Sequence, residues 1–263
     1  MPADPARARA LAGASVVITR PAETAEPLVR GVRSRGGHPV RLPGMRLAPV
    51  DDVPAVRQAL LAAAAYPLWI FTSPAAVRHF AELAPARVPS SDARVFAVGA
   101  GTARALARIG LAATAPARQH DSDGLLAEAQ LADVRGRSVA IIDAPDGGDR
   151  LAPTLRERGA RVERIHVYRR QPPLLAAGHL QRLGSAERPW ISLVSSGLAL
   201  DQLLSALPED LIARWQGEAL VVSSPRLAAQ ARTAGFADIH VARSALTADL
   251  LDCACSVLAH HRL

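Results

Sequence analysis

The sequence predicts an α/β protein with two similar lobes, each built on a parallel sheet. Hydrophobic strand patterns alternate with helical patterns along the 263 residues, which is typical of parallel sheets. Hydrophobic residues make up 49% of the chain, enough for a sizeable core. Much of the first half also returns in the second half, which indicates a duplicated unit.

The first half contains three strand patterns, each leading into a helix. "SVVITRP" begins at Ser15 and precedes the helical pattern of residues 22–37, which stops at two glycines. "PLWIFTSP" (67–74) and "RVFAVGAGT" (94–102) are the next predicted strands. Each of them runs directly into a helical pattern.

The second half repeats this layout. "RSVAIIDAP" (137–145) predicts a strand, the next helix ends at Gly159, and "RVERIHVYRR" (161–170) predicts another strand. "PWISLVSS" (189–196) and "EALVVSSP" (218–225) are strands that again lead into helices. "WIFTSPAAV" resembles "WISLVSSGL", and "VGAGTARALARIG" resembles "VSSPRLAAQARTAG". So long a repeat favours two lobes with a cleft between them over a solenoid.

Composition excludes several chemistries. All 31 basic residues are arginine, because the sequence contains no lysine, and the formal net charge is +7. A Schiff-base lysine, a pyridoxal phosphate anchor and a phosphate-loop lysine are therefore excluded. The positive balance favours an anionic partner. Aromatic residues are only 3%, too few for a base-stacking surface, so no nucleic-acid partner is expected.

Location and cofactors follow from equally simple features. No apolar run approaches the roughly 20 residues of a membrane span, and the N-terminus lacks the apolar stretch of a signal peptide. We therefore expect a cytoplasmic protein with no membrane partner. Cys253 and Cys255 lie two positions apart in a helical pattern, which disfavours a disulfide between them. The histidines are scattered without ligand spacing, so neither a metal nor a cofactor is expected.

Four strand-to-helix junctions carry small polar residues. They are Thr72-Ser73, residues 99–102, Ser195-Ser196 and Ser223-Ser224. The first N–H groups of a helix are unpaired and lie at the positive end of its dipole, so an anion can bind there. Each hydroxyl could instead only cap its helix. Because the junctions fall in both lobes, we favour a ligand with several negative groups.

Other motifs give weaker signals. "GAGTAR" (99–104) begins like a dinucleotide fingerprint, but Arg104 replaces the third glycine. The acidic loop "DAPDGGD" (143–149) fits no calcium-loop spacing and is interpreted as a solvated turn. The sequence has no nucleophile elbow.

Together, seven motifs resemble uroporphyrinogen-III synthases of tetrapyrrole biosynthesis in their order and spacing. They are "VVITRP", "WIFTSPAAVRHF", "VFAVGAGTARAL", "SDGLL", "LRERGARVERIHVYRR", "WISLVSSGLAL" and "VVSSPRLAAQARTAGF". The resemblance covers roughly residues 15 to 258. It implies two α/β lobes joined by a two-strand crossover, with residues 1–43 and 172–263 in the first lobe and residues 44–171 in the second.

The resemblance also implies a reaction. Linear hydroxymethylbilane would close to uroporphyrinogen III, with loss of water and inversion of the last pyrrole ring. The terminal hydroxyl leaves to give an azafulvene, and a spiro intermediate then fragments and recombines. The acetate and propionate arms of this substrate agree with the predicted anion sites. The family further suggests a monomer and leaves room for a transient contact with hydroxymethylbilane synthase.

Site residues are carried over by position. Tyr168, in "VYRR", matches a tyrosine that the family places facing the cleft, where a phenol could donate a proton or hydrogen bond to the departing hydroxyl. It could equally pack between the lobes. The remaining expected substrate-binding residues are Arg20, Thr72, Ser73, Gly99, Thr102, Ser195, Ser196, Ser223 and Arg226. Either arginine could instead be a solvated surface charge.

Two departures from the family pattern stand out. "SSPR" (223–226) replaces a glycine-containing turn found in some members, and Asp143 stands where many relatives have a basic or neutral residue. Asp143 is therefore expected to weaken one carboxylate contact. The alternative function is a binding or regulatory module for an anionic tetrapyrrole-like ligand that kept the fold but turns nothing over. A nucleotide-dependent transferase is disfavoured by the missing phosphate loop.

Overall fold

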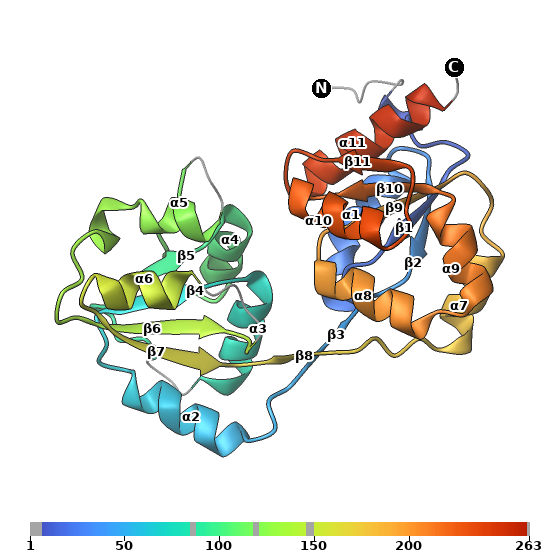
Figure 1. The fold of residues 1–263 in the computed structure, drawn as a ribbon. Coiled ribbons are helices and arrows are strands. Elements are labelled where there is room, and N and C mark those ends of the chain that lie inside the picture. The colour runs from blue at the N-terminus through green and yellow to red at the C-terminus, as the bar shows by residue number, and fades with distance from the viewer. Residues whose placement is uncertain (1–6, 85–87, 118–120, 146–149, 262–263) are drawn as a thin grey trace. The chain divides into compact units, whose positions relative to one another are not determined.

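The computed structural model describes residues 7–84, 88–117, 121–145 and 150–261 (Figure 1). The chain divides into two compact units: unit 1 is Met1–Leu47 with Gln171–Leu263, and unit 2 is Ala48–Arg170. Each unit contains one parallel sheet, so the predicted α/β class with two parallel-sheet lobes is confirmed. Among the described residues, every helix is too short or too polar to cross a membrane.

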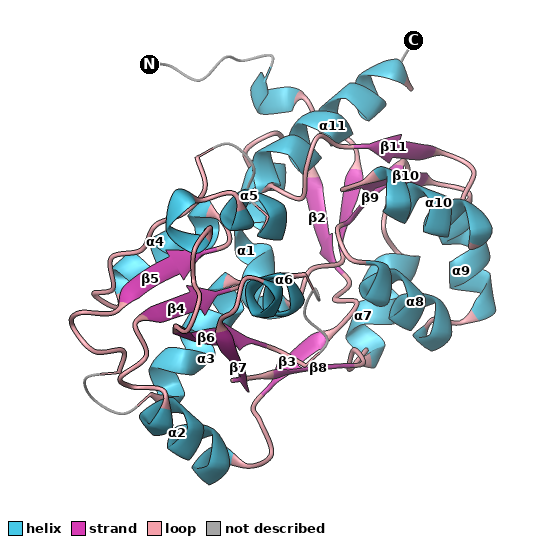
Figure 2. Ribbon diagram, turned by 60° about the vertical axis from the view of Figure 1, so that its left-hand side comes forward, coloured by secondary structure: helices cyan, strands magenta, loops and turns pink. Residues whose placement is uncertain are grey.

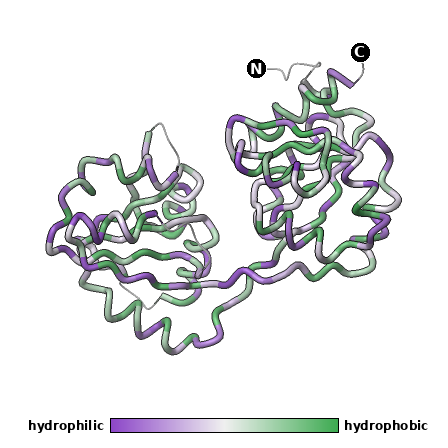
Figure 3. Tube along the Cα trace, in the orientation of Figure 1, coloured by the Kyte–Doolittle hydropathy of each residue, from purple (hydrophilic) through white to green (hydrophobic). Residues whose placement is uncertain are grey.

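The sheet of unit 1 has five strands in the order β11-β10-β9-β1-β2. All neighbouring pairs are parallel, and Val17, for example, lies between Val40 and Ser192. The strands are β1 (Ser15–Ile18), β2 (His38–Arg41), β9 (Trp190–Val194), β10 (Ala219–Val222) and β11 (Ile239–Val241). The central strands β1, β9 and β10 are buried along their whole length and consist mostly of hydrophobic residues, which Figure 3 colours green, because helices cover both faces of the sheet.

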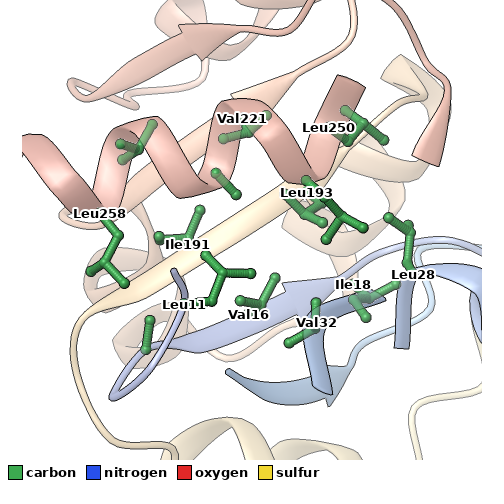
Figure 4. Close-up of a cluster of buried hydrophobic side chains, with 14 of the residues drawn as sticks. Leu11, Val16, Ile18, Leu28, Val32, Ile191, Leu193, Val221, Leu250 and Leu258 are labelled. Carbon is green, nitrogen blue, oxygen red and sulfur yellow. The ribbon is translucent and has the colours of Figure 1, made fainter. Parts of the chain in front are cut away.

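Alternate residues of these strands face two separate cores. Val16 and Ile191 pack against α1 and α11, as Figure 4 shows, whereas Val17 and Val194 pack toward α8, α9 and α10. The helices of unit 1 are η1 (Arg7–Arg9), α1 (Ala22–Arg33), α7 (Ala177–Gly184), α8 (Gly197–Ala206), α9 (Glu209–Gln216), α10 (Pro225–Thr233) and α11 (Thr247–His260).

Unit 2 has a four-stranded parallel sheet in the order β5-β4-β6-β7. Its strands are β4 (Leu68–Phe71), β5 (Arg94–Ala97), β6 (Ser138–Asp143) and β7 (Arg161–His166), and its helices are α2 (Val53–Ala62), α3 (Pro74–Leu83), α4 (Ala100–Arg108), α5 (Ser122–Leu126), η2 (Ala129–Leu131) and α6 (Leu151–Glu157). On one face Ile70 packs with α5 and α6. On the other, the ring of Phe80 in α3 lies 5.9 Å from Trp69 and 5.0 Å from Phe71.

The repeat seen in the sequence is also present in the topology. Strands β10-β9-β1-β2 of unit 1 correspond to β5-β4-β6-β7 of unit 2, so the two sheets share one strand order. The edge strand β11 has a reduced counterpart in unit 2, where a single parallel bridge joins Phe96 to Thr114 beyond β5. This correspondence explains why the first strand-helix-strand segment joins the last third of the chain in one sheet.

A separate two-stranded sheet marks the passages between the units. It pairs β3 (Arg46–Ala48) with β8 (Arg169–Gln171), which are both drawn as magenta strands in Figure 2. The two-strand crossover implied by the resemblance is therefore confirmed. The sequence predicted one strand at residues 161–170, and this prediction was wrong in one respect. The segment is two strands, β7 and β8, with Val167 and Tyr168 between them.

Gly44 allows the chain leaving β2 to approach α8 closely. A Cβ atom at this position would lie 2.6 Å from Cβ of Ala199 and 2.7 Å from its carbonyl oxygen. The Gly44 N–H also donates to the carbonyl of Thr19 over 2.9 Å. The connection after β2 is thus held against the carboxyl-terminal edge of the sheet, where the candidate site of unit 1 lies.

Candidate functional site

In unit 1, the predicted residues follow three neighbouring parallel strands. Ser195 comes directly after β9, Ser223 directly after β10, and Arg20 two residues after β1. Because β10, β9 and β1 are adjacent and parallel, these residues lie at one edge of the sheet. This is the edge where ligands of open α/β sheets bind.

The second serine of each pair in unit 1 is a helix cap. The Ser196 hydroxyl accepts a hydrogen bond from the Ala199 N–H (3.4 Å) at the start of α8. Ser224 does the same for the Leu227 N–H (3.3 Å) at the start of α10. Capping, which the sequence left open, therefore occupies Ser196 and Ser224. Ser195 and Ser223 precede the caps.

A hollow of about 420 Å³ opens at this edge of unit 1. It is lined by Ser195, Gly197, Leu198, Asp201, Ser223, Ser224, Arg226, Leu227 and Gln230. Three serine hydroxyls, two helix N-termini and an exposed guanidinium suit an anionic group. Asp201 is the one carboxylate in the lining, and it accepts a hydrogen bond from Nε2 of Gln230 over 2.7 Å.

Arg20 is engaged elsewhere in unit 1. Its guanidinium donates to Oγ1 of Thr247 (3.4 Å) and to the carbonyl of Ala245. Burial lowers the pKa of Arg20 from its usual value, because the charged form loses solvation. Arg20 therefore ties the end of β1 to the start of α11.

In unit 2, the predicted residues again follow parallel strands at one edge. The Thr72 hydroxyl donates to the carbonyl of Ile142 (3.3 Å) after β4, and Ser73 caps α3 by accepting from the Ala76 N–H (3.1 Å). Gly99 is the N-cap of α4 and has extended backbone there. Thr102, in the first turn of α4, is only 3% exposed, so its side chain is buried.

Tyr168 is the centre of a small polar cluster in unit 2. Its side chain is 2% exposed. The hydroxyl lies 3.4 Å from Oγ of Ser73 and 3.5 Å from Nη2 of Arg170. The ring stacks on the His79 ring, with centroids 5.3 Å apart and planes 16° apart. A phenol between a serine hydroxyl and a guanidinium has polar partners on both sides, and its O–H can donate a hydrogen bond.

Comparison with protein-family patterns shows to which family the chain belongs. The sequence pattern of the family described as uroporphyrinogen-III synthase HemD matches residues 26–252. The chain belongs to the uroporphyrinogen-III synthase family.

Individual relatives agree with this membership. Uroporphyrinogen-III synthase of Salmonella typhimurium (strain LT2) is 30% identical over 245 residues, covering 88% of this chain and 96% of the relative. The enzyme of Escherichia coli (strain K12) is 28% identical over 239 residues, with the same coverage. The fold is similar to the crystal structure of uroporphyrinogen-III synthetase from Helicobacter pylori, with a TM-score of 0.62, 15% identity and coverage of 92% and 99%.

Sequence reasoning missed one group of interacting residues at the edge of the sheet in unit 2. Asp143, 2% exposed at the end of β6, accepts from Nε (2.8 Å) and pairs with Nη2 (2.7 Å) of Arg164, and its other oxygen lies 2.6 Å from Nδ1 of His166. The sequence did contain a signal for this group. Arg164 and His166 are two positions apart, which places both side chains on one face of β7 beside β6.

This pairing changes the meaning of Asp143. The residue was expected to weaken one contact with a substrate carboxylate, but in the structure its carboxylate pairs with the Arg164 guanidinium and lies 2.6 Å from Nδ1 of His166. It is also a strand residue, whereas positions 146–149 of the acidic loop lie outside the described residues. The backbone of Asp143 also contacts the segment that leads to Tyr168, because the Val167 N–H donates to the Asp143 carbonyl over 3.0 Å.

Proposed function

We propose that this chain closes linear hydroxymethylbilane to uroporphyrinogen III, with loss of water and inversion of the last pyrrole ring. The observation that carries the proposal is the family match over residues 26–252. The relatives named as uroporphyrinogen-III synthases cover 88% of the chain, so the match is not confined to one unit.

Each unit offers its own places for the acetate and propionate carboxylates. In unit 1, the hollow at Ser195, Ser223 and Arg226 takes one group or more. In unit 2, the helix N-termini after Ser73 and Gly99 offer N–H groups and a positive dipole end. The net charge of +7 favours such a polyanionic substrate.

The chemistry asks little of any one side chain. Loss of the terminal hydroxyl needs a proton or hydrogen-bond donor, and the Tyr168 phenol beside Arg170 serves in that role. The azafulvene then reacts with carbon atoms of the same molecule, so no oxidant, reductant or group carrier enters the balance. The protein's main task is to hold the folded substrate so that the inverted product forms.

The finer assignments belong to the same proposal. The enzyme is a hydro-lyase without a cofactor, works as a monomer in the cytoplasm, and contacts hydroxymethylbilane synthase only transiently. Neither nucleic acid nor membrane is among its partners. Aromatic residues amount to only 3% of the chain, which supports the absence of a nucleic-acid partner.

The proposal is tested by the rate at which hydroxymethylbilane disappears. The purified chain is added to freshly generated substrate, and cyclic product is followed against a control without protein. Closure well above the spontaneous rate supports the enzyme. A folded protein that binds the substrate but leaves the rate unchanged would instead support the non-catalytic binding module.

A further inference from the structure

Three side chains of unit 1 converge outside the candidate site. They are Asp238, just before β11, His240 within β11, and His261, directly after α11. Nε2 of His240 lies 2.7 Å from Oδ1 of Asp238, and Nε2 of His261 lies 3.2 Å from Oδ2 of the same residue. One ligand atom from each residue lies within 4.8 Å of the other two.

The packing of β11 explains why these residues meet. Ile239 packs on the side of α8, α9 and α10, whereas Ala242 belongs to the core beneath α11. Alternation along the strand therefore turns Asp238 and His240 toward the α11 side. On that side, the buried side chains of Val257 and Leu258 anchor the last turn of α11 in the core. The His261 N–H donates a hydrogen bond to the Val257 carbonyl over 3.1 Å, which places His261 next to this turn.

This cluster is distinct from the anion site. Asp238 and the start of β11 lie at the amino-terminal edge of the parallel sheet, whereas the hollow at Ser195 and Ser223 lies at the carboxyl-terminal edge. The ligand chemistry differs as well, because the anion site collects hydroxyls and N–H groups. The cluster collects one carboxylate and two imidazoles.

We propose that Asp238, His240 and His261 bind one divalent transition-metal ion of the zinc class. Two imidazole nitrogens and one carboxylate oxygen form a donor set that suits zinc, whereas magnesium and calcium prefer oxygen ligands throughout. Water takes the fourth position. The side chains of Asp238, His240 and His261 are 39%, 36% and 40% exposed, and His261 borders an open hollow of about 690 Å³, so an ion can reach the cluster.

The distances are close to what an ion needs. With bonds of about 2.0–2.2 Å, tetrahedral donors stand roughly 3.4 Å apart. Nε2 of His240 lies 2.7 Å from one Asp238 oxygen and Nε2 of His261 lies 3.2 Å from the other, and half-exposed side chains can rotate to bring one donor atom from each residue to the same ion. The same Nε2 atoms now face the Asp238 carboxylate as hydrogen-bond donors, so the ion takes the place of those protons.

Such an ion would link the end of α11 to the edge strand β11. β11 is an edge strand, and α11 is the last helix. An ion held by both binds the folded unit only, and so it raises the thermal midpoint of unfolding. This inference does not depend on the catalytic proposal, since both the ligands and their test lie outside the reaction.

The experiment measures zinc binding by calorimetry on the full chain without a histidine tag. Cys253→Ser/Cys255→Ser serves as the background, which removes thiol ligands on α11. His240→Ala and His261→Ala are compared with His260→Ala, because His260 is the neighbouring histidine and binds the Ser256 carbonyl instead (2.7 Å). Thermal midpoints are recorded with zinc and with magnesium for each variant.

We expect one zinc ion per chain in the background and in His260→Ala. Affinity should fall by more than about tenfold in His240→Ala and in His261→Ala, since even outer-shell changes cost 10–100-fold. Zinc should raise the thermal midpoint only where it binds, and magnesium should not. Equal zinc affinity in all four proteins, or no zinc binding by a folded background protein, would overturn the proposal.

Discussion

At the scale of single residues, Tyr168 carries the strongest claim in the candidate site. Its hydroxyl lies near Ser73 and Arg170, and its ring is fixed by stacking on His79. The phenol is buried, which agrees with the packing role that the sequence left open. Its polar neighbours also agree with a role as a hydrogen-bond donor. A substitution that removes only the hydroxyl and keeps the ring separates donation from packing.

Tyr168→Phe should lower kcat by roughly 10- to 100-fold, the equivalent of losing one hydrogen bond to a charged group worth about 1.5–3 kcal/mol. Folding should be retained, because the contacts of the hydroxyl are long. Tyr66→Phe is the matched control: Tyr66 is the other tyrosine, and it donates to Glu163 (2.8 Å) at the amino-terminal end of β4. Steady-state kinetics of the two variants decides. Equal activity in both would remove Tyr168 from any acid role.

Asp143→Asn should lower the free energy of unfolding by about 3 kcal/mol, because it removes the charge that pairs buried Asp143 with Arg164. Asp51→Asn is the control, since its pair with Arg169 is exposed and such pairs contribute about 0–1 kcal/mol. Urea unfolding of both variants gives the two values. A loss for Asp143→Asn no larger than that for Asp51→Asn would show that the Asp143 group is not a structural support.

At the scale of elements, three of the four strand-to-helix junctions have a serine in second place that caps the following helix, whereas Gly99 makes no side-chain cap at the fourth. The second residue caps the helix in α3, α8 and α10, where Ser73, Ser196 and Ser224 accept backbone hydrogen bonds. The first residue, such as Ser195 or Ser223, lines the hollow in unit 1. We therefore expect the capping role to fall on the second residue of these junctions and the proposed anion contacts to fall mainly on the first, although Ser224 both caps α10 and lines the hollow.

Ser196→Ala and Ser224→Ala should each lower the free energy of unfolding by about 1 kcal/mol through loss of the cap. Ser195→Ala and Ser223→Ala should leave stability nearly unchanged and should instead raise KM. Denaturant titrations and initial rates on all four variants separate these effects. Should the first serines prove as important for stability as the second, the proposed division of roles would be wrong.

Sequence patterns located the main strands and their junctions because hydrophobic runs and small polar residues leave a local signal. They did not reveal that Thr102 is buried or that Arg20 binds the Ala245 carbonyl. Those outcomes depend on which elements pack together. The break between β7 and β8 was missed for a similar reason, since Tyr168 continues the strand-like alternation of "RIHVYRR".

At the scale of the whole molecule, the two units repeat one strand order and place polar junctions at the same edge of each sheet. The repeat in the sequence made this duplication predictable. The asymmetries were not predictable, because β11 and its single-bridge counterpart at Phe96 and Thr114 are too short to leave a pattern. The convergence of Asp238, His240 and His261 arises only through the packing of α11 near β11.

Raising the ionic strength from about 0.1 M to 1 M should raise KM several-fold and change kcat little. Screening lengths fall from about 10 Å to 3 Å over this range, and the attraction between a chain of net charge +7 and a polyanionic substrate weakens accordingly. Initial rates across a salt series measure this. A KM independent of salt would contradict binding through charged and dipolar groups.

The central claim is that this chain directs closure toward the inverted isomer, and the product itself tests it most directly. Freshly generated hydroxymethylbilane is incubated with the purified protein, the products are oxidised, and the type I and type III isomers are separated by chromatography. The account predicts mainly type III, in an amount that rises with protein concentration. Only type I, formed at the spontaneous rate by a protein shown to be folded, would contradict it.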